Sequence, residues 1–592
     1  MLNQKIIEAD FCVVGGGIAG MCAAISAARH GAQVVLIHER PVLGGNASSE
    51  IRVWISGAHG EDNRETGILE EIALENLYRN PTKNWYIWDT VLYDFVKREK
   101  NITLLLNCTC IDAECESGDF ADGRNTRIKS VTGYMMTTQT KITVKAKFFS
   151  DCSGDSILAP LTGAEFRIGR ESADEFGEDT HVKFRDNMTM GNSCLIQGRE
   201  GTQSVKYTHP DGFKKFTDKD FEFRPIYPYN SWENYWYLEL GGNRDTVNDA
   251  EEIADELREL ALGTWDYMKN SGKYDVANWD LEFLGFLPGK RESRRMVGEY
   301  IINERDVSEC RRFEDTVAYG GWPIDDHFPM GFYHKNTANT DFKTPAPYPL
   351  PYRALYSKNV ENLFFAGRNI SMTHMAMSSI RVMATCGLLG QAVGTAAALA
   401  CEHGLTPNEV YKNKDMLGEL KRRLMDDDCY LPFNSREVAE SAVENGVGID
   451  AGLHDGNDRV HRLIPGKAVY TSELGCALEY KFNNAEYVDS VHVVFDSDLN
   501  RQTLPGNRCE QEHSTRANVL LNSPQMHMPT TLIKEFSLCV KFSDGNERVY
   551  EVKNNRKRAY HFEVKDNIIG ITLTPSATWG SENARIISFD YR

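Results

Sequence analysis

Three glycines near the start of the chain limit its possible folds more than any other feature. Gly15, Gly17 and Gly20 form the pattern G-x-G-x-x-G, and the apolar residues before them predict a strand over residues 11–14. A helix and a second strand are expected to follow, up to residue 38. The first glycine allows a tight turn, the second lets a pyrophosphate approach bare backbone, and the third lets the helix pack closely on the strand. The pattern therefore predicts a βαβ unit that binds a dinucleotide.

The start of the helix and the end of the second strand complete this expected site. The pyrophosphate is expected over the first helical residues, Ile18 and Ala19, because free N–H groups and the helix dipole favour an anion there. Glu39 follows the second strand, where its carboxylate is placed to accept hydrogen bonds from a ribose 2′-hydroxyl. The alternative is a βαβ unit without a ligand, which an acid at this position disfavours.

A second glycine pair follows the acid in the segment ERPVLGGNASSEIRV. Here the chain resembles the FAD-dependent oxidoreductases of the glutathione-reductase-like superfamily, and within it the bacterial group known simply as FAD-dependent oxidoreductases. The resemblance implies that this segment wraps the adenosine ribose and the pyrophosphate of FAD. The residues it assigns to the cofactor are Arg40, Gly44, Gly45, Asn46 and Ser48.

Two further segments resemble parts of the same superfamily that contact FAD. One contacts the ribityl and pyrophosphate region and the other contacts the adenine. In DCSGD, the resemblance implies that Ser153 and Gly154 form a turn against the ribityl and pyrophosphate region. Asp155 is assigned to the same region, although an N-cap of the next helix explains it equally well. The strand within residues 101–114 is expected to present backbone groups to the adenine around Cys110.

The segment NLFFAGRN resembles the closing fingerprint of the superfamily, where the chain meets the flavin end of FAD. Gly367 and Arg368 are the residues for this role. The helix that follows is expected to direct its N-terminus at the carbonyl oxygens of the isoalloxazine, where a positive helix end stabilises negative charge.

Three residues are the candidates for catalysis. His374 follows the closing fingerprint and is interpreted as a base that is neutral at working pH, with a pKa near ~6.5. Arg381 is interpreted as binding an anionic or oxygen-rich substrate, or the flavin itself. His59, in the loop SGAHGE, is the second candidate base. The alternative for the first two is a satisfied buried histidine and a structural salt bridge.

The role of four arginines in two basic segments is open. They either line an anion or polyol site or form ordinary ion pairs with nearby acids, among them Glu292. The arginines are Arg291, Arg294, Arg295 and Arg353.

The order of these segments predicts a mixed α/β fold in three parts. A Rossmann-like FAD-binding domain is expected over 1–165 and 348–428, with an inserted α+β substrate cap over 166–347. Short alternating runs separated by Gly, Asn and Asp predict an all-β sandwich over 440–592. This part resembles galactose-binding-like domains, and we expect it to be separable from the rest of the chain.

Composition narrows the partners and the compartment. A net charge of −19 disfavours binding to nucleic acid or to an anionic membrane. The apolar stretch 382–400 is interpreted as a buried helix, because it is rich in small residues and contains Gln391. The cysteines show no zinc-binding spacing, which predicts reduced thiols, a cytoplasmic location and no metal. The oligomeric state stays open.

Two functions remain open from the sequence. The first is an FAD-dependent dehydrogenase that takes a hydride from a small oxygen-rich substrate, a sugar or a hydroxy acid, to the flavin N5. Its electron acceptor is unknown, since no second G-x-G-x-x-G marks a domain for NAD(P)H. The alternative is a non-redox, carbohydrate-directed lyase or binding protein that uses the fold as a scaffold.

Overall fold

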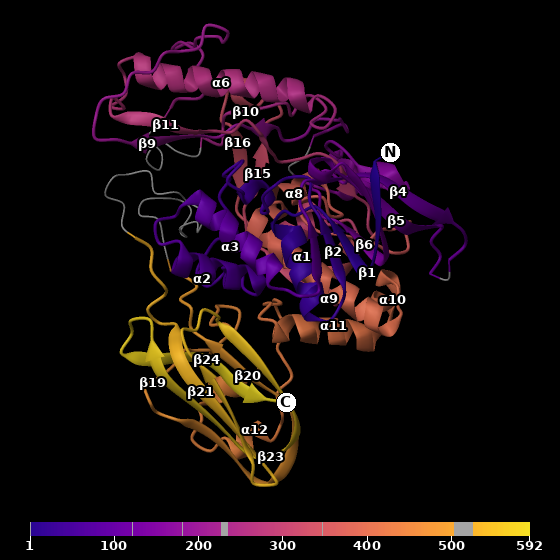
Figure 1. The fold of residues 1–592 in the computed structure, drawn as a ribbon, viewed down its shortest axis with the longest axis vertical. Helices are drawn as coiled ribbons and strands as arrows, with labels where there is room; N and C mark the ends of the chain where they lie inside the picture. Colours follow the sequence, from indigo (N-terminus) through magenta and orange to yellow (C-terminus); the bar gives the residue numbers. More distant parts are fainter. Residues whose placement is uncertain (1, 121, 180–181, 227–234, 346, 502–524) are drawn as a thin grey trace.

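The computed structural model describes the chain except for residues 1, 121, 180–181, 227–234, 346 and 502–524. Figure 1 shows three parts along the long axis of the molecule. A region around helix α6 (Ala250–Asn270) lies at one end, a central α/β part lies in the middle, and an antiparallel sheet lies at the other end. The mixed α/β class expected from the sequence is confirmed for the central part.

A seven-stranded sheet forms the core of the central part, in the order β3-β2-β1-β6-β5-β4, with β18 also paired to β6. Strands β3, β2, β1, β6 and β18 run parallel, whereas β4 and β5 form an antiparallel extension. Apolar β-branched and aromatic residues fill the buried strands, as in parallel sheets covered on both faces. The strands are β1 (Asn3–Val14), β2 (Val34–Ile37), β3 (Ile102–Leu105), β4 (Cys108–Ser117), β5 (Thr126–Met135), β6 (Thr140–Asp151) and β18 (Leu363–Phe365).

Two helices with many small residues pack against each other beside this sheet. In α9 (Met383–His403), a Cβ at Gly390 would lie 2.0 Å from the carbonyl oxygen of Ala19 in α1 (Ile18–Arg29). The glycine therefore allows the two backbones to touch. Helix α9 is long and apolar enough to cross a membrane, but 94% of its most apolar window is buried inside the protein. The expected buried helix is confirmed.

Shorter helices complete the central part. Asn84 caps α3 by accepting the N–H groups of Tyr86 and Ile87, and Thr406 caps α10 with a reciprocal capping box. These helices are α2 (Ile68–Arg79), α3 (Trp85–Lys97), α4 (Leu158–Thr162), α8 (His374–Ile380), α10 (Pro407–Lys412) and α11 (Lys414–Asp426).

The region between β6 and β18 consists of small sheets and a long helix, in the place expected for a cap. Helix α6 is amphipathic and buries Leu257, Leu260 and Trp265 on one face. The strands are β7 (Phe166–Arg167), β8 (Asn192–Ser193), β9 (Ile196–Glu200), β10 (Glu239–Leu240), β11 (Trp279–Leu284), β12 (Gly289–Lys290), β13 (Arg295–Met296), β14 (Thr316–Gly320), β15 (Ile324–His327), β16 (Asn339–Phe342) and β17 (Tyr348–Pro351). The other helices are α5 (Ala173–Phe176) and α7 (Glu304–Ser308).

The C-terminal part contains one six-stranded antiparallel sheet in the order β19-β24-β20-β23-β21-β22. The all-β class is therefore confirmed, and a sandwich of two sheets remains a prediction. Its strands are β19 (Tyr470–Glu473), β20 (Leu478–Phe495), β21 (Ile533–Phe542), β22 (Glu547–Val552), β23 (Ala559–Thr578) and β24 (Asn583–Tyr591), preceded by α12 (Ala442–Asn445).

The C-terminal sheet is not set apart as we expected. Leu74 and Leu77 of α2 belong to the same hydrophobic cluster as the interior of this sheet. Arg501 donates two hydrogen bonds of 2.8 Å to the buried carboxylate of Glu70. Shared apolar burial and enclosed ion pairs join the two parts. The separability of the C-terminal sheet stays a prediction, and these contacts argue against it.

Candidate functional site

Four parallel strands of the central sheet end at the same level and define one edge. Val14 is paired with Ile37 and Asp151, and Asp151 is paired with Phe365. The loops that follow these residues therefore gather at the carboxyl edge of the sheet, where open α/β sheets bind their ligands.

The glycines of the first loop have the steric roles that their spacing predicts. Gly15 has a φ of +111°, and a Cβ there would lie 2.3 Å from the carbonyl oxygen of Cys152. A Cβ at Gly20 would lie 1.8 Å from the carbonyl oxygen of Gly15. Around Gly17, by contrast, no atom lies closer than 3.9 Å to such a Cβ. Gly17 is the N-cap of α1 and supplies no side-chain cap, so the helix end faces open space.

The expected ribose-binding acid is accessible at the end of β2. The Glu39 side chain is 47% exposed and lies 3.5 Å from the Arg40 guanidinium. Burial raises the pKa of Glu39, but the contacts with His38 and Arg40 outweigh it and lower the pKa to about 2. Strand β4 starts beside this point, since Cys108 donates its N–H to the His38 carbonyl. Cys110 follows on β4 with its side chain buried.

The second glycine pair folds back onto the first loop. Gly44 forms a β-bridge with Gly17 and donates its N–H to the Gly16 carbonyl. Asn46 is half-buried and donates to the Lys290 carbonyl at 2.9 Å, which ties the loop to the cap. Ser48 is fully enclosed, and its Oγ has no hydrogen-bond partner among the described residues. Its assignment to the cofactor stays a prediction.

The DCSGD turn has different hydrogen bonds from those predicted. Helix α4 has no side-chain cap from Asp155, because Asp151 Oδ2 accepts the Leu158 N–H and Ser153 Oγ accepts the Ile157 N–H. The N-cap interpretation of Asp155 is wrong. Its carboxylate is held instead by Arg368 at 2.6 Å and by Lys290 at 2.9 Å.

The ion pairs of Asp155 bring three distant segments together at the same edge. Burial raises the pKa of Asp155, but the charges of Arg368 and Lys290 outweigh it and hold the pKa well below its usual range. Gly154, with a φ of +79°, leaves room for the guanidinium of Arg368 at 3.2 Å from its Cβ position. The DCSGD turn and the closing fingerprint thus contact each other at this edge.

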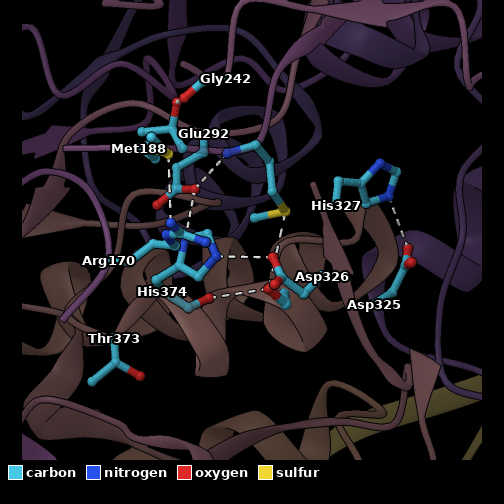
Figure 2. A network of polar contacts seen from close by, with 12 residues as sticks. Arg170, Met188, Gly242, Glu292, Asp325, Asp326, His327, Thr373 and His374 are labelled. Atoms are coloured by element: carbon cyan, nitrogen blue, oxygen red, sulfur yellow. Dashed lines mark hydrogen bonds and ion pairs between the residues drawn. The ribbon is translucent and has the colours of Figure 1, made fainter. Parts of the chain in front are cut away.

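His374 lies in a buried network of charges at the start of α8 (Figure 2). Its Nδ1 lies 2.8 Å from Glu292 Oε2, and its Nε2 lies 2.9 Å from Asp326 Oδ1. Burial lowers the pKa of His374, but these two carboxylates outweigh it and raise the pKa to about 10. With both nitrogens donating, the ring is an imidazolium and cannot accept a proton at neutral pH.

The prediction of a neutral base at His374 is therefore wrong. The side chain is also only 1% exposed, so it does not face the space at the carboxyl edge. The alternative interpretation, a buried histidine whose two ring nitrogens both have hydrogen-bond partners, describes it better. Its effect on the site passes through Asp326, whose side chain is 17% exposed.

Arg381 joins a second group of charges that continues this network. Its Nη2 donates to the Asp325 carboxylate at 3.1 Å, while its Nε has no hydrogen-bond partner in the described part of the chain. Asp325 also contacts His327, which lies 2.6 Å from Glu239. Burial lowers the pKa of His327, but Glu239 and Asp325 outweigh it and raise the pKa. Arg381 is 12% exposed, as is Arg291, which pairs with Glu239 of this group.

His59 contacts the loop that precedes β15, the strand that contains Asp325. Its ring contacts the Trp322 ring at a centroid distance of 4.5 Å, and its N–H is donated to the Gly321 carbonyl. The side chain is half-buried. His59 thus stays a candidate that lines the site through the loop before β15.

A sequence model of a protein family described as FAD dependent oxidoreductase matches residues 10–424. The chain belongs to this family. FAD is accordingly its cofactor. No curated protein matches the chain.

Several solved structures are similar in fold, at low identity. The geranylgeranyl bacteriochlorophyll reductase-like protein of Thermoplasma acidophilum is 12% identical, with 71% of this chain and 86% of that chain covered and a TM-score of 0.30. The p-nitrophenol 4-monooxygenase PnpA of Pseudomonas putida is 11% identical, with coverage of 72% and 86% and a TM-score of 0.30. The quinol fumarate reductase subunit FrdA of E. coli is 12% identical, with coverage of 71% and 75% and a TM-score of 0.27.

The residues of the carboxyl edge fit the FAD that the family binds. The open helix end at Gly17 suits a pyrophosphate, and the accessible Glu39 suits a ribose hydroxyl. Of the two helices after the closing fingerprint, α8 is already capped by the Thr373 hydroxyl, and Glu171 accepts its first N–H. The N-cap of α9, Val382, has no side-chain cap, so α9 is the helix that suits the flavin end.

The four arginines of the basic segments were expected either to line an anion or polyol site or to form ordinary ion pairs. Two of them form ion pairs and two remain compatible with a substrate site. Arg295 is fully buried between Glu292 and Glu171, and Arg353 binds Asp315 through two hydrogen bonds of 2.9 and 3.0 Å. Both are structural ion pairs. Arg291 pairs with Glu239 at 3.3 Å but stays half-buried, and Arg294 donates to the Asp155 carbonyl from a half-buried position. These two remain compatible with a substrate site.

Sequence analysis missed the acidic end of β15. Asp325, Asp326 and His327 follow one another in the segment WPIDDH, next to the fully enclosed Ile324. Three ionisable residues in a row on a partly buried strand are unusual, because charged residues are seldom buried without partners. This run of three ionisable residues is the sequence feature from which the group could have been predicted.

Proposed function

We propose that this member of the family is a dehydrogenase-type enzyme that oxidises a small, oxygen-rich substrate, a sugar or a hydroxy acid. The observation that carries the proposal is the set of accessible charged side chains beside the N-terminus of α9. Arg381, Asp325 and Asp326 are each 12–17% exposed in an otherwise enclosed network. Cationic and anionic hydrogen-bonding groups at one site match hydroxyl and carboxylate groups on a substrate.

Different residues of the chain bind FAD and the substrate. Gly17, the α1 N-terminus and Glu39 would hold the pyrophosphate and the adenosine ribose of FAD. Arg368 and the N-terminus of α9 would lie toward its flavin end. When bound, FAD supplies the site with an acceptor for a hydride. Arg381 orients the substrate through the exposed part of its guanidinium, and His374 keeps Asp326 ionised and fixed in place.

A substrate panel under anaerobic conditions tests the proposal. Polyols, sugar acids and hydroxy acids are mixed with the yellow holoprotein, and bleaching of the flavin absorbance identifies a substrate. We expect at least one compound of these classes to bleach the flavin within the panel. Failure of all of them, with dithionite still bleaching the flavin, would reject the substrate class. The acceptor that reoxidises the enzyme is then found by adding oxygen or quinones to the bleached protein.

Arg381→Met tests the role of the guanidinium. Loss of one charge-assisted hydrogen bond should raise the KM for an acidic substrate about 10- to 100-fold. Arg381→Lys keeps the charge and should recover part of the loss. An unchanged KM in Arg381→Met would contradict substrate binding by this residue. The non-redox alternative gains no support, because the family match spans the whole predicted FAD-binding region.

A further inference from the structure

Glu65 is a buried carboxylate. It is not one of the residues assigned to FAD, and it does not belong to the network around His374. Its side chain belongs to a residue that is only 3% exposed. It is not among the carboxylates paired with a cation within 4.0 Å in the described part of the protein. This distinguishes it from Glu70, Glu71 and Glu75, which all hold arginines. A buried acid without a cation is costly and is typical of functional sites.

The two oxygens of Glu65 have different surroundings. Oε1 accepts the Ala58 N–H at 2.8 Å and lies 3.5 Å from the Thr385 hydroxyl. Oε2 lies against Gly57, where a Cβ would come within 2.3 Å of it. Oε2 accepts no hydrogen bond from the described residues, yet it is not sealed inside protein. It therefore keeps a small accessible surface beside the half-buried Gly57.

That space lies at the flavin end of the site. Thr385 is in the first turn of α9, and Ala384 donates its N–H to the Ser56 carbonyl at 3.0 Å. Along α9, Gly387, Gly390 and Gly394 lie in turn against Ile18, Ala19 and Ala23 of α1. The two helices thus run in the same direction and present their N-termini at the same edge. Glu65 lies beside the second of these N-termini.

We propose that Glu65 is the proton acceptor of the site. When a hydroxyl group is bound against Gly57, its O–H bond breaks, the electron pair stays on that oxygen, and the proton forms an O–H bond with Oε2. This inference rests on the proposed oxidation of a hydroxyl-bearing substrate. It replaces His374, whose ring is already protonated.

The surroundings of Glu65 favour its protonated form more than water does. Burial raises the pKa of Glu65, and the Ala58 N–H and the Arg64 charge only partly offset the rise. The other charged or titratable groups that face it are Arg459, Tyr319 and Tyr348. Both tyrosines are fully buried, and burial raises their pKa above the ordinary value. They stay neutral, so Glu65 is the group in this cluster that exchanges a proton.

Glu65→Gln tests the proposal, because glutamine keeps an acceptor for the Ala58 N–H but cannot take a proton. The first readout is the midpoint potential of bound FAD between about pH 5 and about pH 9, where the slope counts the protons taken up on reduction. We expect an additional slope in the wild type that is lost in Glu65→Gln. Glu178→Gln is the matched control, since Glu178 is equally buried, lies at α8 and also has a pKa raised by burial. It should keep the wild-type slope.

Retention of the additional slope in Glu65→Gln, or its absence from the wild type, would overturn the proposal. If Glu65→Gln does not fold, Glu65→Asp should shift the pH range of the slope, and an unshifted range would count against it. Once a substrate bleaches the flavin, Glu65→Gln should reduce the rate of bleaching about 10²- to 10⁴-fold. Failure of the substrate panel would reject the proposed function and leave the potential measurement as a separate test of Glu65.

Discussion

His374 should make the stability of the protein depend on pH in a direction opposite to that of an ordinary buried histidine. Its pKa is raised to about 10 in the folded chain by Glu292 and Asp326 despite burial, and an unfolded histidine has a pKa of about 6.5. A raised pKa stabilises the folded state fully below the unfolded value, and the stabilisation is lost as the pH rises through the folded value. The window for His374 is therefore about pH 6.5 to about pH 10.

The magnitude follows from the two pKa values. Linkage gives a contribution of about 4–5 kcal/mol at about pH 6 and about 1–2 kcal/mol at about pH 9. The free energy of unfolding should thus lose about 3 kcal/mol between these pH values through this one residue. Replacing His374 removes this interaction from Glu292 and Asp326, while Glu292 keeps Arg295.

Urea unfolding of wild type and His374→Gln at both pH values measures the effect. Release of the flavin, followed by its fluorescence, reports the transition of the part of the protein that contains the residue. The difference between wild type and variant should be about 3 kcal/mol larger at about pH 6 than at about pH 9. A change below about 1 kcal/mol would refute the imidazolium assignment.

His461→Gln is the control for this measurement. Burial and the charges of Arg459 and Arg462 lower the pKa of His461 to about 4. A lowered histidine pKa destabilises the folded state as the pH falls through the unfolded value, so this control should show a pH dependence of the opposite sign.

Two more predictions concern the cofactor and the C-terminal sheet. Glu39→Ala should weaken FAD binding by about 1–2 kcal/mol, through loss of a charge-assisted hydrogen bond, and flavin retention on dialysis checks it. Equal retention in wild type and variant would contradict the ribose assignment. A chain ending at about residue 430 lacks Arg501 and Arg558, which pair with Glu70 and Asp428, so Glu70 keeps only Arg64. We expect it to lose its flavin or fail to fold, since truncation exposes Leu74 and Leu77 of α2 to water; a stable yellow fragment would show that these contacts contribute little.

The nucleotide-binding part of the fold could be predicted from the sequence because its signals are local. Gly15, Gly17 and Gly20 act within one turn, and each meets the steric demand that its position predicts. The buried nature of α9 was also predictable, since Gly390 and its neighbours are small enough for close helix packing. The joining of the C-terminal sheet to α2 was not, because it depends on Arg501 finding Glu70, which is 431 residues away in sequence.

The candidate site shows the same limit at a smaller scale. The position of His374 after the closing fingerprint was correctly noted, but its protonation state depends on Glu292 and Asp326, which are 82 and 48 residues away in sequence. Spacing along the chain carries no information about such partners. Glu65 could not be selected from the sequence, because nothing local distinguishes it from the neighbouring acids Glu61, Asp62 and Glu70.

His374 and Glu65 are both buried, but their neighbours favour opposite responses of their charge. Burial alone would favour the neutral form of either group. His374 has two carboxylates within hydrogen-bonding distance, so its charged form is favoured and it has no free nitrogen with which to accept a proton. Glu65 has an N–H donor and no paired cation among the described residues, so burial keeps its proton affinity high. A base must be able to change its charge at working pH, and of these two groups only the carboxylate is placed to do so.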